Sequence, residues 1–96
     1  MRKARPAVII NSDAAGRMLL RLIVPLTGWQ EAFANYFWMT RIEPTRSNNL
    51  QKTSAADAFQ MRGADVGRFK GRIGVLPQDV LDQITQAIAV TIELNT

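Results

Sequence analysis

Two polar side chains stand where two apolar segments of the sequence are expected to meet. The sequence predicts β-strands over Ala7–Ile10 and Leu19–Leu26, with Arg5 just before the first strand and Thr27 directly after the second. If these strands pair antiparallel, the start of one lies beside the end of the other. A guanidinium and a hydroxyl group would then converge at one edge of the sheet. Because the planar guanidinium binds two phosphate oxygens at once, this pair suggests a phosphate-binding site.

Each of these residues also has a purely structural explanation. Arg5 could be an ordinary solvated residue before a strand, and Thr27 could be present for its β-propensity alone. The residue types that the chain lacks narrow the chemistry further. It contains no histidine and no cysteine, which removes imidazole acid–base catalysis, disulfides and thiolate metal sites. Acidic Asp79 and Asp82 fit the first turn of a helix better than a metal site, so we expect no metal and no cofactor.

The basic residues favour a polyanionic partner. All 12 Lys and Arg, nine of them Arg, lie in residues 1–75 together with five acids, whereas residues 76–96 hold three acids and no base. An arginine-rich basic body is typical of nucleic-acid binding. On composition alone, ordinary solvated surface charges explain the pattern equally well.

The length of the chain predicts one domain over residues 1–96. No apolar run approaches the ~18 residues of a membrane span, and the first ten residues lack the apolar core and cleavage site of a secretory signal. Together with the absence of cysteine, this predicts a cytoplasmic protein without membrane contact. So short a chain buries a modest share of its surface, which favours cover by a second subunit.

The rest of the pattern predicts mostly β-structure with one helix. A turn is expected at residues 13–16, and residues 28–36 are expected to leave the sheet with one helical turn. A polar turn at Thr45–Lys52 is expected to hold Asn49 in the left-handed conformation. Three further strands are predicted, over Phe37–Glu43, Ala55–Arg62 and Arg68–Leu76.

Residues 77–94 show the spacing of an amphipathic helix, with Pro77 in its first turn. Its apolar face is marked by residues at i, i+3 and i+4 spacings, namely Leu81, Ile84, Ala87, Ile88 and Ile92. This face is expected to pack on the core in preference to forming an interface.

The motifs RPAVIINSDA, LRLIVPLT and FQMRGADVGRFKGRIGVL, followed by this helix, resemble the MazF/PemK family of toxin endoribonucleases. The run NNLQKTSAADAFQMR is especially similar to one branch of that family. Each motif is weak alone, but the set covers nearly the whole chain in order and with compatible spacing.

The resemblance implies a mainly β fold with a C-terminal helix (α+β): a small, strongly curved, SH3-like β-barrel, usually a homodimer. It implies a type II toxin that cleaves single-stranded RNA without a metal and is neutralised by a co-expressed antitoxin. Attack by the RNA's 2′-hydroxyl would leave 2′,3′-cyclic phosphate and 5′-hydroxyl ends. Carried over by position, Arg5 and Thr27 are the catalytic pair. The positions where family members contact RNA or line its channel are Ser12, Gly28, Gln60 and Arg62.

Arg5 and Thr27 are expected to play different roles in the reaction. Arg5 would stabilise the charge on the phosphorane oxygens, whereas an arginine with a pKa above ~12 is a poor proton acceptor. We therefore assign Arg5 to charge stabilisation first and proton transfer second, with Thr27 holding the phosphate in line. Gln60 and Arg62 could equally be ordinary exposed residues that alternate on one strand face.

The sequence departs from the family in two places. Phe59 stands where the family has an acid just before Gln60, so a scheme that uses this carboxylate does not transfer. The family also has an earlier Gly-Asp-containing strand and loop before the Arg-Pro motif. A barrel without this strand would expose unpaired backbone groups at its edge, so we expect a chain that still folds, with this edge repaired or paired, but has reduced activity.

Two other functions share the same fold. One is a toxin that poisons DNA gyrase by protein contact, which the presence of both Arg5 and Thr27 argues against. The other is a non-catalytic relic that binds only antitoxin or RNA. The aromatic residues Trp29, Tyr36 and Trp38 could stack on bases, but packing at a barrel rim or an interface is the better interpretation.

Overall fold

The structure is a computed structural model, and it describes residues 5–10 and 20–93. The turn expected at residues 13–16, Ser12 and Leu19 lie outside these ranges. Five antiparallel strands are followed by one helix, α1 (Gln78–Glu93). The strands are β1 (Ala7–Ile9), β2 (Leu20–Gly28), β3 (Met39–Ile42), β4 (Ser54–Asp57) and β5 (Arg62–Asp65). The mainly β class with a C-terminal helix is therefore confirmed.

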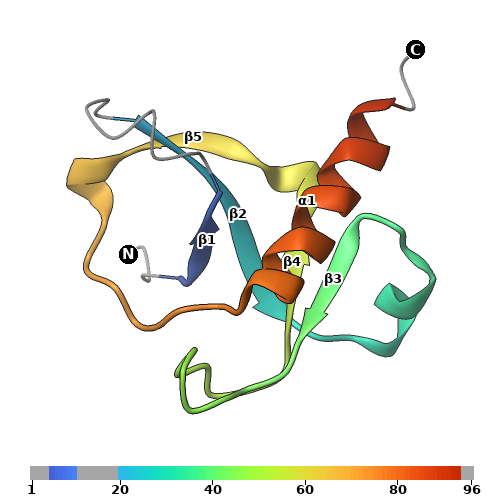
Figure 1. Ribbon diagram of the computed structural model, residues 1–96, viewed down its shortest axis with the longest axis horizontal. Coiled ribbons are helices and arrows are strands. Elements are labelled where there is room, and N and C mark those ends of the chain that lie inside the picture. The colour runs from blue at the N-terminus through green and yellow to red at the C-terminus, as the bar shows by residue number, and fades with distance from the viewer. Residues whose placement is uncertain (1–4, 11–19, 94–96) are drawn as a thin grey trace.

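The sheet has the order β1-β2-β4-β3, with β5 also paired to β2, and over the described residues it does not close on itself. Figure 1 shows the strands curving around the molecule, with α1 lying across one face of the sheet. The helix contacts β3 and the short 3₁₀ turn η3 (Ala58–Gln60). Within the described ranges, no helix is long and apolar enough to cross a membrane.

Strand β2 is the centre of the sheet because it pairs with three other strands. One edge pairs with β1, while the other pairs with β5 over Leu20–Ile23 and with β4 over Leu26–Gly28. The Leu22 carbonyl and the Leu26 N–H both bond toward β1, so the backbone of Pro25 faces the opposite edge. There it meets the gap between β5 and β4, where the missing N–H of proline leaves no ladder bond unmade.

Two predicted strands are wrong. The strand expected over Ala55–Arg62 is split, because η3 inserts three residues between β4 and β5. The Asp57 carboxylate stabilises this turn by accepting a hydrogen bond from the Phe59 N–H at 3.1 Å.

The strand expected over Arg68–Leu76 is likewise absent from the described chain. A 3₁₀ turn, η4 (Val66–Arg68), leads into a segment without regular structure. This segment is held by isolated bonds to the polar turn: the Val75 N–H donates to the Ser47 carbonyl, and the Asn49 amide donates to the Ile73 carbonyl. These two hydrogen bonds hold the segment in place without the paired backbone groups of a β-strand.

Other expectations are confirmed. Residues 28–36 contain the helical turn η2 (Glu31–Asn35), and Asn49 adopts a φ of 55° in the polar turn. Strand β3 forms within Phe37–Glu43 but is shorter than that range.

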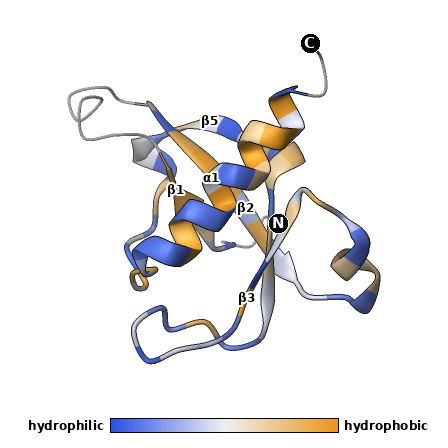
Figure 2. Cartoon of the chain, turned by 45° about the vertical axis from the view of Figure 1, so that its right-hand side comes forward, coloured by the Kyte–Doolittle hydropathy of each residue, from blue (hydrophilic) through white to orange (hydrophobic). Residues whose placement is uncertain are grey.

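The core lies between the sheet and α1. Its buried cluster is formed by Val8, Val24, Leu26, Ile42, Ala56 and Ile84. Figure 2 shows hydrophobic residues along β2 and on one side of α1, with hydrophilic residues on the other side of the helix. Ile84 and Ala87 are buried as predicted, whereas Ile92 is 55% exposed. The prediction for Ile92 is wrong because the last turn of α1 runs past the sheet (Figure 1).

Candidate functional site

The register of β1 and β2 places Arg5 opposite Thr27. The two strands pair Ala7 with Pro25 and Val8 with Val24, and the same register, continued by two residues, sets Arg5 across from Thr27. The pairing does extend that far, since the Leu26 N–H donates to the Pro6 carbonyl at 3.1 Å. Because side chains alternate along a strand, Arg5 and Thr27 lie on the same face of the pair, and Leu26 points to the core.

A cavity of about 300 Å³ opens at this end of the sheet. Arg5 and Pro6 line it before β1, and the end of β2 contributes Leu26, Thr27 and Gly28. Its lining is completed by Ser54, the first residue of β4, and by Lys52, two residues before it. The structure thus brings together three of the site residues expected from the sequence: Arg5, Thr27 and Gly28.

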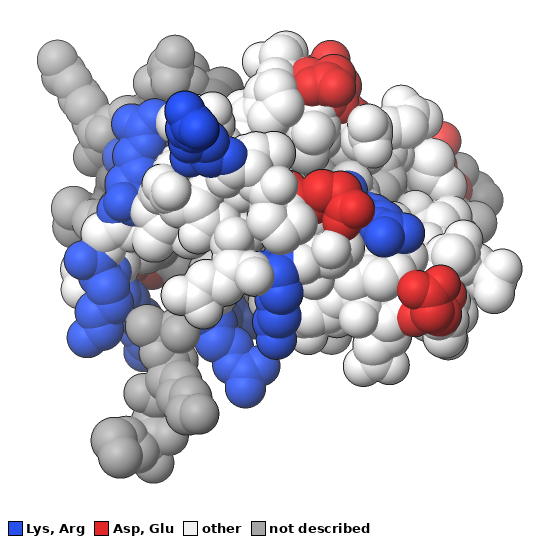
Figure 3. All heavy atoms as spheres, turned by 90° about the horizontal axis from the view of Figure 1, so that it is seen from below, with Lys and Arg blue, Asp and Glu red and all other residues white. Residues whose placement is uncertain are grey.

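The electrostatics of this cavity favour an anion. Arg5 and Lys52 supply two cationic groups to its lining, and no described carboxylate lines it. Figure 3, which views the molecule from below Figure 1, shows most Lys and Arg side chains of the face drawn toward one side, with Asp and Glu mostly toward the other. In the described part of the chain, no three acidic side chains come close enough together to hold a metal ion.

Sequence reasoning missed Lys52 and Ser54. Their place in the cavity follows from the pairing of β2 with β4, which sets Ser54 opposite Gly28. The signal that could have found them is the polar step Lys52-Thr53-Ser54 directly before an apolar strand. This polar segment points to the cavity only once it is known that β4 pairs with the end of β2 that carries Thr27.

The neighbouring Thr53 is fixed by Glu43, which follows β3. The Thr53 hydroxyl donates to the Glu43 carboxylate at 2.6 Å, and Arg41 lies 3.5 Å from the other carboxylate oxygen. The hydrogen bond from Thr53 lowers the pKa of Glu43, and the positive charge of Arg41 lowers it further. The anionic form of Glu43 therefore ties the start of β4 to the end of β3.

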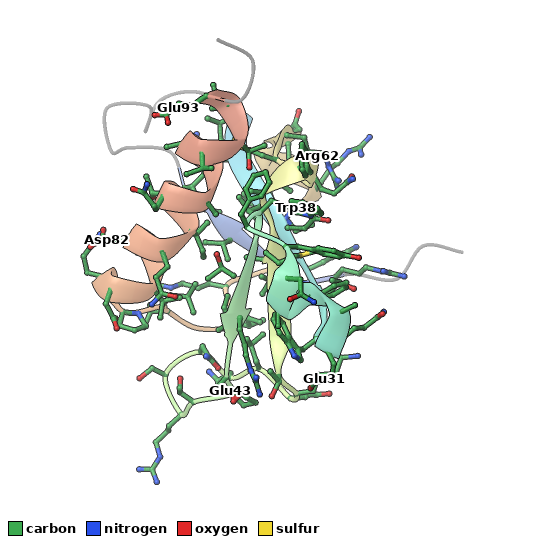
Figure 4. The ribbon with its side chains drawn as sticks, turned by 90° about the vertical axis from the view of Figure 1, so that its right-hand side faces the viewer. Glu31, Trp38, Glu43, Arg62, Asp82 and Glu93 are labelled. Carbon is green, nitrogen blue, oxygen red and sulfur yellow. The ribbon has the colours of Figure 1, made fainter. Side chains whose placement is uncertain are left out.

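Gln60 and Arg62 do not line the cavity. Gln60 belongs to η3, so the expected alternation of the two residues on one strand face is wrong. Arg62 pairs with Ile23, four residues along β2 from Thr27, which corresponds to about 13 Å at the rise of a strand. Figure 4 shows Arg62 and Glu43 at opposite ends of the sheet. A role of either residue in binding RNA stays a prediction, as does that of Ser12, which lies outside the described residues.

The aromatic residues in the segment 29–38, between β2 and β3, pack on one another. The rings of Tyr36 and Trp38 stack with centroids 4.6 Å apart, and Phe59 meets Trp38 edge-on at 4.9 Å. Phe59 therefore belongs to an aromatic cluster, at the position where the resemblance implies an acid. These contacts agree with the packing interpretation of Tyr36 and Trp38.

A curved antiparallel sheet with one C-terminal helix, carrying an Arg–Thr pair at the end of its central strands, is the architecture expected of a MazF-type toxin. The model of the family described as PemK-like, MazF-like toxins of type II toxin–antitoxin systems matches residues 1–92. The chain belongs to this family.

Solved structures show the same fold at low sequence identity. The Mycobacterium tuberculosis toxin MazF-mt6 superposes with a TM-score of 0.80 at 17% identity, over 95% of this chain and 88% of that one. The MazE–MazF structure from Deinococcus radiodurans gives a TM-score of 0.72 at 19% identity, over 93% of this chain and 82% of that one. No curated protein sequence matches the chain.

Proposed function

We propose that this toxin is an endoribonuclease that cuts single-stranded RNA, including mRNA, without a metal ion. The observation that carries the proposal is the shared cavity of Arg5 and Thr27. Its size and cationic lining suit a phosphate group with part of a ribose, and membership of the MazF-like family supports the same substrate.

In the proposed reaction, the 2′-hydroxyl oxygen of one nucleotide attacks the adjacent phosphorus. The bond from phosphorus to the 5′-oxygen then breaks, which leaves a 2′,3′-cyclic phosphate and a 5′-hydroxyl group. Arg5 donates hydrogen bonds to the phosphate oxygens as negative charge builds up on them, an interaction worth about 2.7–4 kcal/mol in comparable enzymes. The Thr27 hydroxyl group donates a hydrogen bond to the phosphate. This bond holds the phosphorus and the departing 5′-oxygen in line with the attacking 2′-oxygen.

The lining of the cavity supports this division of roles. No described carboxylate lines it, and Phe59 packs against Trp38 in the aromatic cluster. The proton of the 2′-hydroxyl is therefore assigned to solvent or, secondarily, to Arg5, and the departing 5′-oxygen takes up a proton from the solvent. This scheme predicts cleavage that speeds up as the pH rises through the neutral range.

The same proposal includes a protein partner and a place of action. The solved Deinococcus radiodurans relative contains MazE together with MazF, and by analogy this toxin binds a co-expressed antitoxin. We further propose that it acts as a homodimer in the cytoplasm, where mRNA is available.

The test is incubation of the purified chain with single-stranded RNA in the presence of EDTA, followed by analysis of the fragment ends. We expect 2′,3′-cyclic phosphate and 5′-hydroxyl ends. Arg5→Ala should lower the rate by about 100- to 1000-fold, as for the loss of one oxyanion donor. Arg46→Ala is the matched control, because Arg46 is an exposed arginine of the polar turn that does not line the cavity. Equal rates in the parent and the Arg5 variant would remove Arg5 from the site.

A further inference from the structure

Lys52 places a second cation beside Thr27 through its contact with Gly28. A Cβ atom built on Gly28 would stand 3.1 Å from the Lys52 Nζ and 3.3 Å from its Cε. The ammonium group therefore lies close against the place that a side chain at position 28 would take, and would have to shift slightly to admit one. Both residues line the cavity that also holds Arg5.

The backbone around Lys52 is fixed on both sides. The hydroxyl of Ser54, which is buried, donates to the Lys52 carbonyl at 3.0 Å. The Trp29 N–H donates to the Thr53 carbonyl at 3.0 Å, which continues the β2–β4 ladder past Gly28. Thr53 is in turn bound to Glu43. These bonds hold the Cα of Lys52 beside the end of β2, so its side chain has a short path to the cavity.

The ammonium group has no competing anion among the residues described. Glu43, the carboxylate beside Thr53, is paired with Arg41, and none of the described residues that line the cavity is acidic. Two cations, Arg5 and Lys52, therefore line the same cavity as the Thr27 hydroxyl. The two non-bridging oxygens of a phosphodiester share its negative charge, so one such group can accept hydrogen bonds from both cations.

Resting on the proposed ribonuclease function, we infer that Lys52 is a further catalytic residue: its ammonium group donates a hydrogen bond to a non-bridging oxygen of the phosphate that Arg5 and Thr27 hold. Gly28 serves this contact by leaving room for the lysine side chain. The absence of a Cβ at position 28 is then a requirement of Lys52 and not of a direct contact between Gly28 and RNA.

The main test compares Lys52→Ala with Lys70→Ala, a second exposed lysine that does not line the cavity. Single-turnover cleavage at saturating protein is the readout, because it separates the chemical step from binding. We expect Lys52→Ala to slow cleavage by about 10- to 100-fold, less than a buried oxyanion donor would because Lys52 is exposed. Lys52→Arg should restore most of the rate, and Lys70→Ala should leave it unchanged.

A double-mutant cycle tests the role of Gly28. Gly28→Ala should slow cleavage by several-fold in the parent, since it pushes Nζ away from its place, and should have no further effect in Lys52→Ala. If Gly28→Ala slows both backgrounds equally, Gly28 contacts RNA itself and this part of the inference is overturned. Cleavage by Lys52→Ala at the parent rate would overturn the whole inference while leaving the ribonuclease proposal intact.

A binding measurement keeps the two proposals separate. An oligonucleotide with a 2′-deoxy substitution at the cut site cannot be cleaved, and its binding can be followed against salt concentration by fluorescence anisotropy. Loss of one phosphate contact should reduce the salt slope by about 0.7 in Lys52→Ala. A parent that binds this probe without cutting intact RNA would refute the ribonuclease proposal. The contact of Lys52 with phosphate would still be decided by the slope, since an unchanged slope would refute it.

Discussion

Gly74 lies directly against the backbone of Asn48. A Cβ atom at position 74 would stand 2.7 Å from the Asn48 Cα and would collide with the Ser47 carbonyl oxygen. The turn that it touches is rigid, since the buried Asn48 side chain accepts hydrogen bonds from the N–H groups of Thr45 and Leu50. This contact anchors the irregular segment before α1 to the polar turn after β3.

Gly74→Ala is therefore expected to lower the free energy of unfolding by about 1–3 kcal/mol, because the clash is with backbone atoms that cannot rotate away. Gly63→Ala is the control, since a Cβ on Gly63 meets nothing within 4 Å. By restricting the unfolded chain it should be neutral or stabilise by about 0.4–1 kcal/mol. Urea unfolding of both variants would check this, and equal effects at the two positions would contradict the close approach.

Replacement of Thr27 should separate its hydroxyl group from its shape. Thr27→Val keeps the β-branched form and β-propensity but removes the proposed hydrogen bond to the phosphate. A hydrogen bond to a charged group is worth about 1.5–3 kcal/mol, so RNA cleavage should fall by about 10- to 100-fold. Thr27→Ser retains the hydroxyl group and should stay within a few-fold of the parent. A fully active valine variant would exclude the hydroxyl group from the reaction.

Glu43 should make stability depend on pH in the acid range. Its pKa in the folded chain is lowered from 4.5 by the Thr53 hydroxyl and by Arg41. The contribution of its anionic form is therefore complete above the unfolded-state value and is lost as the pH falls through the folded-state pKa. A Thr53→Val substitution should raise the pKa of Glu43 toward 4.5. An NMR titration of the Glu43 carboxyl carbon in the parent and the variant measures this shift directly.

The control for this pH effect is Glu43→Gln, which keeps the size of the side chain but cannot titrate. Its unfolding free energy should fall less steeply below neutral pH than that of the parent. If the two curves are parallel, the Thr53 hydrogen bond does not favour the ionised form.

Two isoleucines of α1 should respond differently to the same change. Ile84 is 1% exposed and packs in the core cluster, whereas Ile92 is 55% exposed. Ile84→Ala should lower the unfolding free energy by about 2–5 kcal/mol because it leaves a cavity. Ile92→Ala should change it by about 0.5 kcal/mol or less, as for other exposed positions. Thermal or urea unfolding decides, and a large loss at Ile92 would mean that this residue is covered in solution, for example by a second subunit.

Local patterns were sufficient for much of the fold. The period of the helix predicted the buried positions Ile84 and Ala87, and Asn49 was expected in the left-handed conformation that it adopts. These features depend on neighbours within one or two turns of chain, so the residue types alone identify them. The same reasoning overestimated the strands, because it gave no weight to Asp57 within Ala55–Arg62, whose carboxylate accepts a hydrogen bond from the Phe59 N–H at the start of the inserted turn η3.

The sequence by itself indicated two neighbouring apolar strands whose antiparallel pairing would bring Arg5 and Thr27 together, because the segment between them is shorter than a parallel crossover needs. The structure set the register of that pairing. The tertiary structure decided what lies across the other edge of β2. There β4 and β5 pair with separate parts of the strand around the gap at Pro25, and this brings Lys52 against Gly28. This contact depends on the register between segments far apart in the sequence and on the turn η3 that separates β4 from β5. The local periodicity of the sequence predicts neither the register nor the turn.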